Sequence, residues 1–155
     1  MKKQLGSFKH AIDGFISAIR TESHLRFHIV AAVYVFVFAY LGGFDPTEWT
    51  TLIITVCTVI SAELVNTAVE RLCDLYTKDY DKNIKFIKDI AACAVLVFAV
   101  GAAVIALFLF IGTGKLLDAF NVLLSHPLMF IPLALSAVAS VCFIVIPGRK
   151  NKTEK

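Results

Sequence analysis

Charged residues are absent from long stretches of this 155-residue chain: none lies between Phe27 and Phe44, and none between Ile90 and Ile111. Asp, Glu, Lys and Arg together make up 17% of the sequence, whereas hydrophobic residues make up 58% and mean hydropathy is +0.78. A water-soluble domain does not carry uncharged runs of this length. The composition therefore predicts an all-α integral membrane protein.

Several motifs of enzyme chemistry are also missing. The four cysteines form no C-x-x-C pair, so no disulfide framework is predicted. The histidines form no H-E-x-x-H motif; His24 and His28 are four residues apart, and we favour a headgroup or structural role for them over zinc. The segment 112–115, Gly-Thr-Gly-Lys, resembles a phosphate loop, but Leu109 and Leu116 stand where that motif needs Gly and Ser or Thr. We also find no G-x-S-x-G motif and no cleavable signal peptide.

The apolar residues are grouped into four predicted spans, at 27–44, 49–64, 87–111 and 128–146. The second is short, and we expect its helix to continue as an amphipathic extension through Asp74. Residues 1–24 are predicted to form an amphipathic helix on the membrane surface, with an apolar side made of Phe8, Ile12, Phe15, Ile16 and Ile19. We therefore expect one membrane domain: a surface helix at 1–24, a three-span core at 25–111, and an additional span with a basic tail at 112–155.

The positions of lysine and arginine predict the topology. Five of the fifteen lie before or at the first span, five lie in residues 71–88, and four lie in the tail after residue 147. Lys115 is the remaining one and lies in a predicted external connection. The positive-inside rule then places both termini and residues 71–88 in the cytosol. The net charge of +3 suits anionic headgroups or nucleotide phosphate, and we predict no nucleic-acid partner.

The most informative feature is a polar face where the second span leaves the membrane. At about 100° per residue, Glu63, Asn66, Glu70 and Asp74 fall within an arc of roughly 80°. An ionisable residue at the edge of the hydrocarbon is costly, so this face is a candidate functional site. Asp74 lies one turn further out, where it could also cap the helix or pair with a cytosolic lysine.

The same edge of the membrane collects Glu22, Lys88 and Asp89 from two other helices. Carboxylates near a lysine suit phosphoryl transfer, because Mg²⁺ prefers carboxylates together with phosphate oxygens. The lysine can neutralise charge on the phosphoryl group, and another carboxylate can take the proton from an attacking alcohol.

Two other functions fit the polar face less well. A small proton-coupled transporter could use Glu63 and Glu70 as a carboxylate relay, but a relay needs ionisable partners deeper in the membrane, and the spans lack them. A non-enzymatic subunit with a decayed site would not be expected to retain the complete polar set.

The pattern of these residues resembles the prokaryotic diacylglycerol kinase family over residues 8–110. The resemblance is carried by Glu63-x-x-Asn66-Thr67-Ala68-x-Glu70-x-x-x-Asp74, Lys88-Asp89-x-Ala91-Ala92, Glu22-Ser23-x-x-Arg26-x-His28 and Phe8-x-His10. Two features depart from the family: Cys93 replaces its common Gly or Ser, and the span at 128–146 lies outside its three-span core.

The resemblance implies a small homotrimeric kinase of the bacterial cell membrane, with active sites between subunits at the cytosolic interface. It implies ATP as co-substrate, Mg²⁺, and Glu63 as general base toward a lipid hydroxyl. Glu22 and Glu70 would hold the Mg²⁺ of Mg-ATP, and Lys88 would contact the phosphates. The implied nucleotide and phosphate site comprises His10, Glu22, Asn66, Glu70, Lys88 and Asp89.

The family includes kinases of diacylglycerol and of undecaprenol. The Glu-Ser-x-x-Arg-x-His form at residues 22–28 and the Asn-Thr-Ala-Val-Glu form at residues 66–70 look more like the undecaprenol kinases of Gram-positive bacteria. We therefore expect transfer of the ATP γ-phosphate to undecaprenol, giving undecaprenyl phosphate. The alternative is a diacylglycerol kinase that makes phosphatidic acid.

Overall fold

The computed structural model describes residues 2–146, with side chains from residue 6 onward, and every regular element in that range is a helix. Four helical segments are long and apolar enough to cross a membrane: Ser23–Leu41, Pro46–Tyr76, Lys82–Gly112 and Pro127–Val145. The predicted all-α membrane protein with four spans is thereby confirmed. The predicted basic tail lies outside the described residues.

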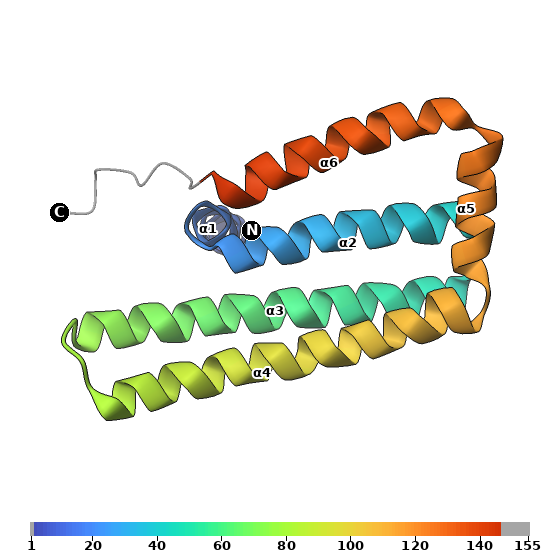
Figure 1. Ribbon diagram of the computed structural model, residues 1–155. Helices are drawn as coiled ribbons and strands as arrows, with labels where there is room; N and C mark the ends of the chain where they lie inside the picture. The colour runs from blue at the N-terminus through green and yellow to red at the C-terminus, as the bar shows by residue number, and fades with distance from the viewer. Residues whose placement is uncertain (1, 147–155) are drawn as a thin grey trace.

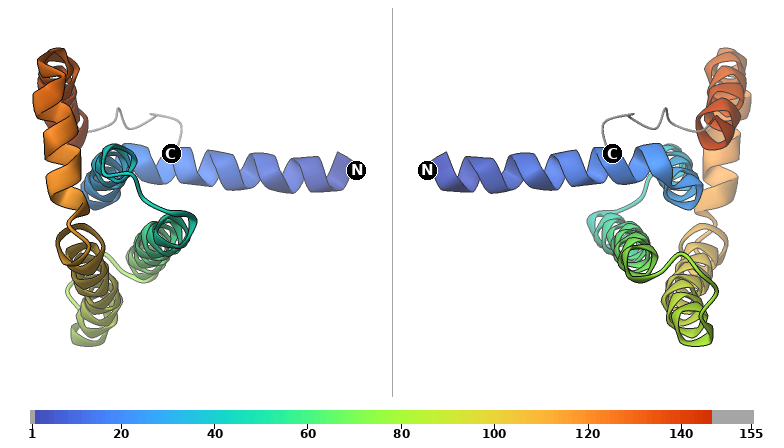
Figure 2. Two further views of the ribbon diagram at one scale, coloured as in Figure 1. Left: turned by 90° about the vertical axis from the view of Figure 1, so that its right-hand side faces the viewer. Right: turned by 90° about the vertical axis from the view of Figure 1, so that its left-hand side faces the viewer.

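Helix α1 (Lys2–Thr21) lies across one end of the bundle and projects sideways from it (Figures 1 and 2). Its residues Phe8, Ile12 and Ile16 are exposed, as expected of a side that faces lipid. The helix stops at Thr21, three residues before the predicted end, because Glu22 has an extended backbone, with φ −106° and ψ 114°. Residues 21–23 form the turn into α2, which we call the elbow.

The connection from α2 (Ser23–Leu41) to α3 (Pro46–Tyr76) is a tight turn at residues 42–45. The side chain of Asp45 accepts hydrogen bonds from the backbone N–H groups of Thr47 and Glu48, and Glu48 bonds back to the Asp45 N–H. Pro46 occupies the first helical position, where its missing N–H costs nothing. Helix α3 then runs for 31 residues without interruption and ends at Tyr76, so the expected extension through Asp74 is confirmed.

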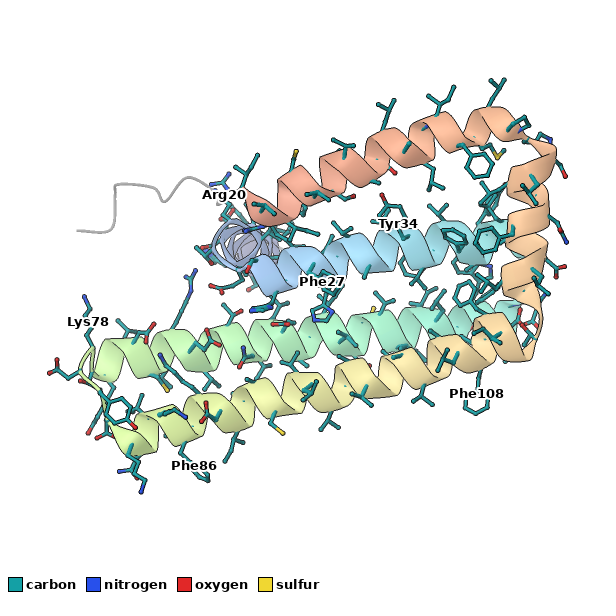
Figure 3. All side chains as sticks on the ribbon, viewed as in Figure 1. Arg20, Phe27, Tyr34, Lys78, Phe86 and Phe108 are labelled. Atoms are coloured by element: carbon teal, nitrogen blue, oxygen red, sulfur yellow. The ribbon has the colours of Figure 1, made fainter. Side chains whose placement is uncertain are left out.

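Helix α4 (Lys82–Ala106) packs beside α3 and continues into a π-helical segment, η1 (Leu107–Gly112). It begins at Lys82, five residues before the predicted span, because the Asp81 side chain accepts hydrogen bonds from the backbone N–H groups of Asn83 and Ile84. Phe86 and Phe108 point outward from this helix (Figure 3). An outward apolar surface is expected for a helix that contacts lipid.

Helix α5 (Lys115–Ser125) was not predicted: the sequence analysis treated this segment as an external connection. It lies crosswise at the end of the bundle opposite α1 (Figure 1). Leu116, Phe120 and Leu123 follow a helical spacing that could have revealed it. The segment 112–115 is a corner, not a phosphate loop, since Lys115 Nζ donates to the Gly43 carbonyl at 2.7 Å.

The corner packs so closely that a side chain at Gly42 would not fit. A Cβ atom there would lie 2.7 Å from the backbone oxygen of Lys115. After α5, a short 3₁₀ segment, η2 (Pro127–Met129), leads into α6 (Phe130–Val145), which returns beside α2 (Figure 1).

The buried core lies at the α5 end of the bundle. It consists of Ala39, Phe44, Leu52 and Phe110, with the rings of Phe44 and Phe110 4.8 Å apart between centroids. The predicted site residues lie at the opposite end of the bundle, where Arg71 of α3 contacts Thr21 at the end of α1. The candidate site is there.

Candidate active site

Glu63 is the buried carboxylate of the site. Its residue is 5% exposed, and its Oε1 lies 3.1 Å from Nε2 of His28 on α2. The pair joins two helices 35 positions apart in the sequence. Spacing along one helix could not reveal this contact, and the sequence analysis assigned His28 a headgroup or structural role.

The His28 contact explains how a carboxylate is tolerated at the membrane edge. An ionised carboxylate removed from water is strongly disfavoured unless a donor or a positive charge accompanies it. His28 Nε2 supplies the N–H donor, or a full positive charge when the ring is protonated. Its side chain is itself 18% exposed, so the pair is largely shielded from water.

Replacing His28 tests this pairing. We expect His28→Leu to lower the free energy of unfolding or transition-state stabilisation by about 1–3 kcal/mol, because a buried Glu63 oxygen loses its donor. The matched variant His28→Gln places an amide N–H at a similar reach and should retain most of both. Thermal unfolding in detergent and turnover should be measured together. Equal effects of the two substitutions would contradict the role of His28 as a donor.

Asn66 and Glu70 form the next part of the same face. Asn66 Nδ2 donates to Glu70 Oε1 at 2.9 Å, which confirms that the two side chains are neighbours on α3. The other Asn66 atom, Oδ1, is buried and has no hydrogen-bond partner within the described residues. A buried acceptor without a partner is uncommon and is a candidate contact for a ligand.

Two lysines near the polar face of α3 form ion pairs with aspartates. Lys88 contacts Asp74 across the α3–α4 pair, and Lys85 Nζ lies 2.8 Å from Asp89 Oδ2 on α4. Asp74 therefore pairs with a lysine, which was one of the two roles left open for it. Lys88 is half-buried, and to contact a phosphate it would exchange Asp74 for the phosphate oxygens.

A groove of about 370 Å³ lies between α1 and α3. His10 from α1 and Thr67 and Arg71 from α3 are among its lining residues. Arg71 also donates to the Thr21 hydroxyl at 2.7 Å, so it connects α3 to the elbow. The sequence analysis counted Arg71 for topology alone. The position of Arg71 directly after Glu70 was a signal for a role at the site, and the sequence analysis missed it.

A second, apolar groove of about 110 Å³ begins at His28 and extends into the spans. Small and aliphatic side chains of α2, α3 and α4 line it, including Ala31, Val35, Val59 and Ala102. The Glu63–His28 pair thus lies where an apolar path between the spans meets the polar end of the bundle.

Glu22 and Glu70, the two predicted magnesium ligands, belong to different parts of the chain, the turn before α2 and the cytosol-proximal half of α3 as predicted from charge. Glu22 is half-buried in the elbow, and Glu70 is half-buried on α3. Their sequence neighbours Thr21 and Arg71 are joined by a hydrogen bond. Among residues 2–146, no group of three or more His, Cys, Asp or Glu side chains gathers as a metal site.

The model of one protein family matches residues 9–110, two thirds of the chain; its description is prokaryotic diacylglycerol kinase. The chain belongs to the prokaryotic diacylglycerol kinase family. As a member of it, the protein is a membrane lipid kinase, a phosphotransferase that uses ATP as a substrate. This decides between the kinase and the transporter in favour of the kinase.

Two curated relatives of this kinase have different substrates in their names. The undecaprenol kinase of Bacillus subtilis is 38% identical over 105 residues, which are 68% of this chain and 85% of that protein. A diacylglycerol kinase of a Synechocystis species is 35% identical over 102 residues, which are 65% of this chain and 58% of that protein. No solved structure matched the chain.

The family match includes every predicted site residue of the kinase, from His10 to Asp89, and ends within η1. Helices α5 and α6 lie outside it. The fourth span thus lies beyond the region that the family model matches.

Proposed function

We propose that this kinase transfers the γ-phosphate of ATP to undecaprenol, giving undecaprenyl phosphate and ADP. The observation that carries the proposal is the Glu63–His28 pair at the mouth of the apolar groove. A long isoprenoid chain in lipid can present its terminal hydroxyl there. The higher identity and fuller coverage of the Bacillus subtilis relative favour undecaprenol over diacylglycerol.

Glu63 is proposed as the general base. Its Oε1 faces His28, so Oε2 takes the proton of the lipid hydroxyl while the hydroxyl oxygen forms a bond to the γ-phosphorus. The bond between the γ-phosphorus and the oxygen bridging to the β-phosphate breaks, and ADP leaves with the electron pair. His28 holds the carboxylate in place, and the proton on Glu63 then passes to water.

The oxygen atoms around Asn66 fit a hard cation bound to nucleotide phosphate. Asn66 Oδ1 is an acceptor that has no partner among residues 2–146, and the carboxylates of Glu70 and Glu22 would supply further oxygen ligands. Glu22 and Glu70 would hold Mg²⁺, which when bound offsets the negative charge of the phosphates. Lys88 and Arg71 would contact phosphate oxygens, while His10 and Asp89 would border the nucleotide.

We further propose that the site faces the cytosol of a bacterial cell membrane and is completed in a homotrimer. The excess of lysine and arginine at the α1 end supports the orientation. Two observations support assembly: residues 2–146 of one chain gather no group of three or more His, Cys, Asp or Glu side chains, and α1 projects sideways, where a neighbouring copy could lie beneath it (Figure 2).

The proposal is tested by Mg²⁺-dependent phosphate transfer from labelled ATP in mixed micelles, with undecaprenol and diacylglycerol offered in parallel to the full chain. We expect clear preference for undecaprenol. Preference for diacylglycerol would replace the proposed substrate but leave the kinase mechanism. Absence of transfer to both lipids, with folded protein confirmed, would overturn the proposed function.

A further inference from the structure

The C-terminal end of the fourth span contacts a buried arginine, Arg26. Helix α6 runs back toward the α1 end, and Arg26 of α2 donates from Nε and Nη2 to the carbonyl of Ile144, at 3.3 and 3.0 Å. Ile144 lies in the last turn of α6. A helix end of this kind has carbonyl groups without partners, and Arg26 supplies donors for one of them.

The same guanidinium also holds the end of α1. Arg26 Nη1 donates to the carbonyls of Ile19 and Arg20, at 2.9 and 3.4 Å. Arg26 is 4% exposed, and within the described residues no carboxylate pairs with it. The C-terminus of a helix carries about half a negative charge, so the two helix ends together offset one guanidinium. The arginine therefore binds α1 and α6 to each other as well as to α2.

The elbow lies between these contacts. On one side Arg26 binds the last turn of α1, and on the other Arg71 of α3 donates to the Thr21 hydroxyl at 2.7 Å. Glu22 is the next residue and has no side-chain hydrogen bond as the cap of α2. Its position relative to α3, which carries Glu63 and Glu70, depends on how firmly the elbow is held.

A second contact sets the register of α6 along α2. The hydroxyl of Tyr34, between the two helices in Figure 3, hydrogen bonds with Ser136 at 2.9 Å and with Ser140 at 3.4 Å. Ser136, Ser140 and Ile144 recur every four residues on α6, and Tyr34 is eight residues beyond Arg26 on α2. Because the helices are antiparallel, docking at Tyr34 carries the Ile144 carbonyl to Arg26.

We propose that α6 is a positioning element for the kinase site. Through Arg26, its C-terminal end holds the elbow and so orients Glu22 toward the metal-bound nucleotide. This inference rests on the proposed function for the role of Glu22, but the mechanical link between α6 and the elbow does not.

The first variant perturbs α6 and leaves the side chains of α1, α2 and α3 unchanged. Val145 is 69% exposed at the last position of α6. Val145→Pro drives Ile144 out of the α region and turns its carbonyl away from Arg26, while Val145→Ala keeps the backbone and is the matched control. Arg26→Lys keeps the charge, but a single ammonium cannot replace the planar group that spans both helix ends.

Two readouts are needed on the full chain. We expect Val145→Pro and Arg26→Lys each to raise the Mg²⁺ concentration for half-maximal lipid phosphorylation by about tenfold, with the KM for lipid unchanged. The double variant should shift no further than either single one, because both break one connection. Amide hydrogen exchange of residues 19–26 should be faster in Val145→Pro than in Val145→Ala.

The outcomes separate this inference from the proposed function. Unchanged exchange at the elbow, or a Mg²⁺ dependence of Val145→Pro equal to that of Val145→Ala, would overturn the positioning role of α6. A fall in turnover with no change in Mg²⁺ dependence would do the same, since it would indicate a merely structural effect. Faster exchange in a protein that phosphorylates no lipid alcohol would uphold the link between α6 and the elbow and overturn the proposed function.

Discussion

Glu63→Gln is expected to lower turnover by roughly 10²–10⁴-fold while nucleotide binding is retained. Glutamine has the shape of glutamate and its oxygen still accepts from His28 Nε2, so the fold and the contact 3.1 Å away should persist. What is lost is the ability to take a proton from the lipid hydroxyl. Steady-state lipid phosphorylation and equilibrium binding of a non-hydrolysable ATP analogue measure the two effects separately.

The matched control is Glu48→Gln, an identical change on the same helix at the α5 end of the bundle. Glu48 accepts from the Asp45 backbone N–H at 2.7 Å, a bond that glutamine can also make. It should leave turnover and binding unaltered. If Glu63→Gln turned over like the unaltered protein, Glu63 would not be the base. Loss of nucleotide binding in the same variant would assign Glu63 to the nucleotide site instead.

Glu70→Gln is expected to raise the Mg²⁺ concentration required for activity by ~10–100-fold or more. Loss of an outer-shell partner already lowers metal affinity by that factor, and Glu70 is proposed as a direct ligand. The Asn66 amide can still donate to the glutamine oxygen, so the local hydrogen bond should remain. The negative charge that favours the cation is removed. Initial rates measured against Mg²⁺ at saturating ATP report this requirement directly.

Glu48→Gln serves again as the control, with an unchanged Mg²⁺ requirement. A variant at Glu70 whose Mg²⁺ dependence matched that of the unaltered protein would show that the carboxylate does not hold the metal. If activity were lost at every Mg²⁺ concentration and thermal stability fell as well, the Asn66–Glu70 bond would be structural, and the metal assignment would have to be withdrawn.

The spans and the polar face of α3 could be predicted because both depend on local chemistry. A run without charged residues is long enough to cross a bilayer or it is not, and helical periodicity places Asn66 and Glu70 side by side whatever surrounds them. The resemblance to a kinase family rests on the same local patterns and was confirmed. The missed helix α5 was also a local signal, in Leu116, Phe120 and Leu123.

Contacts between helices could not be predicted, because they depend on how distant segments pack. Nothing in the spacing of His28 and Glu63 indicates that one would accompany the other. Likewise, Asp74 shares an arc with Glu63, yet its side chain is exposed and pairs with Lys88 from α4. The roles of Glu63 as base and of Glu22 and Glu70 as metal ligands remain predictions.

The sequence by itself determined that this chain crosses a membrane, that Asn66 and Glu70 share one face of α3, and that the chain belongs to a family of lipid kinases. The first two follow from hydropathy and from a repeat of about 3.6 residues, and the third from motifs of nearby residues, so all three are properties of neighbouring positions. Only the tertiary structure decided which groups are partners: His28 with Glu63, Asp74 with Lys88, and Arg26 with the ends of two helices. A buried charge is stable only beside a suitable partner, and folding alone brings partners from separate helices together.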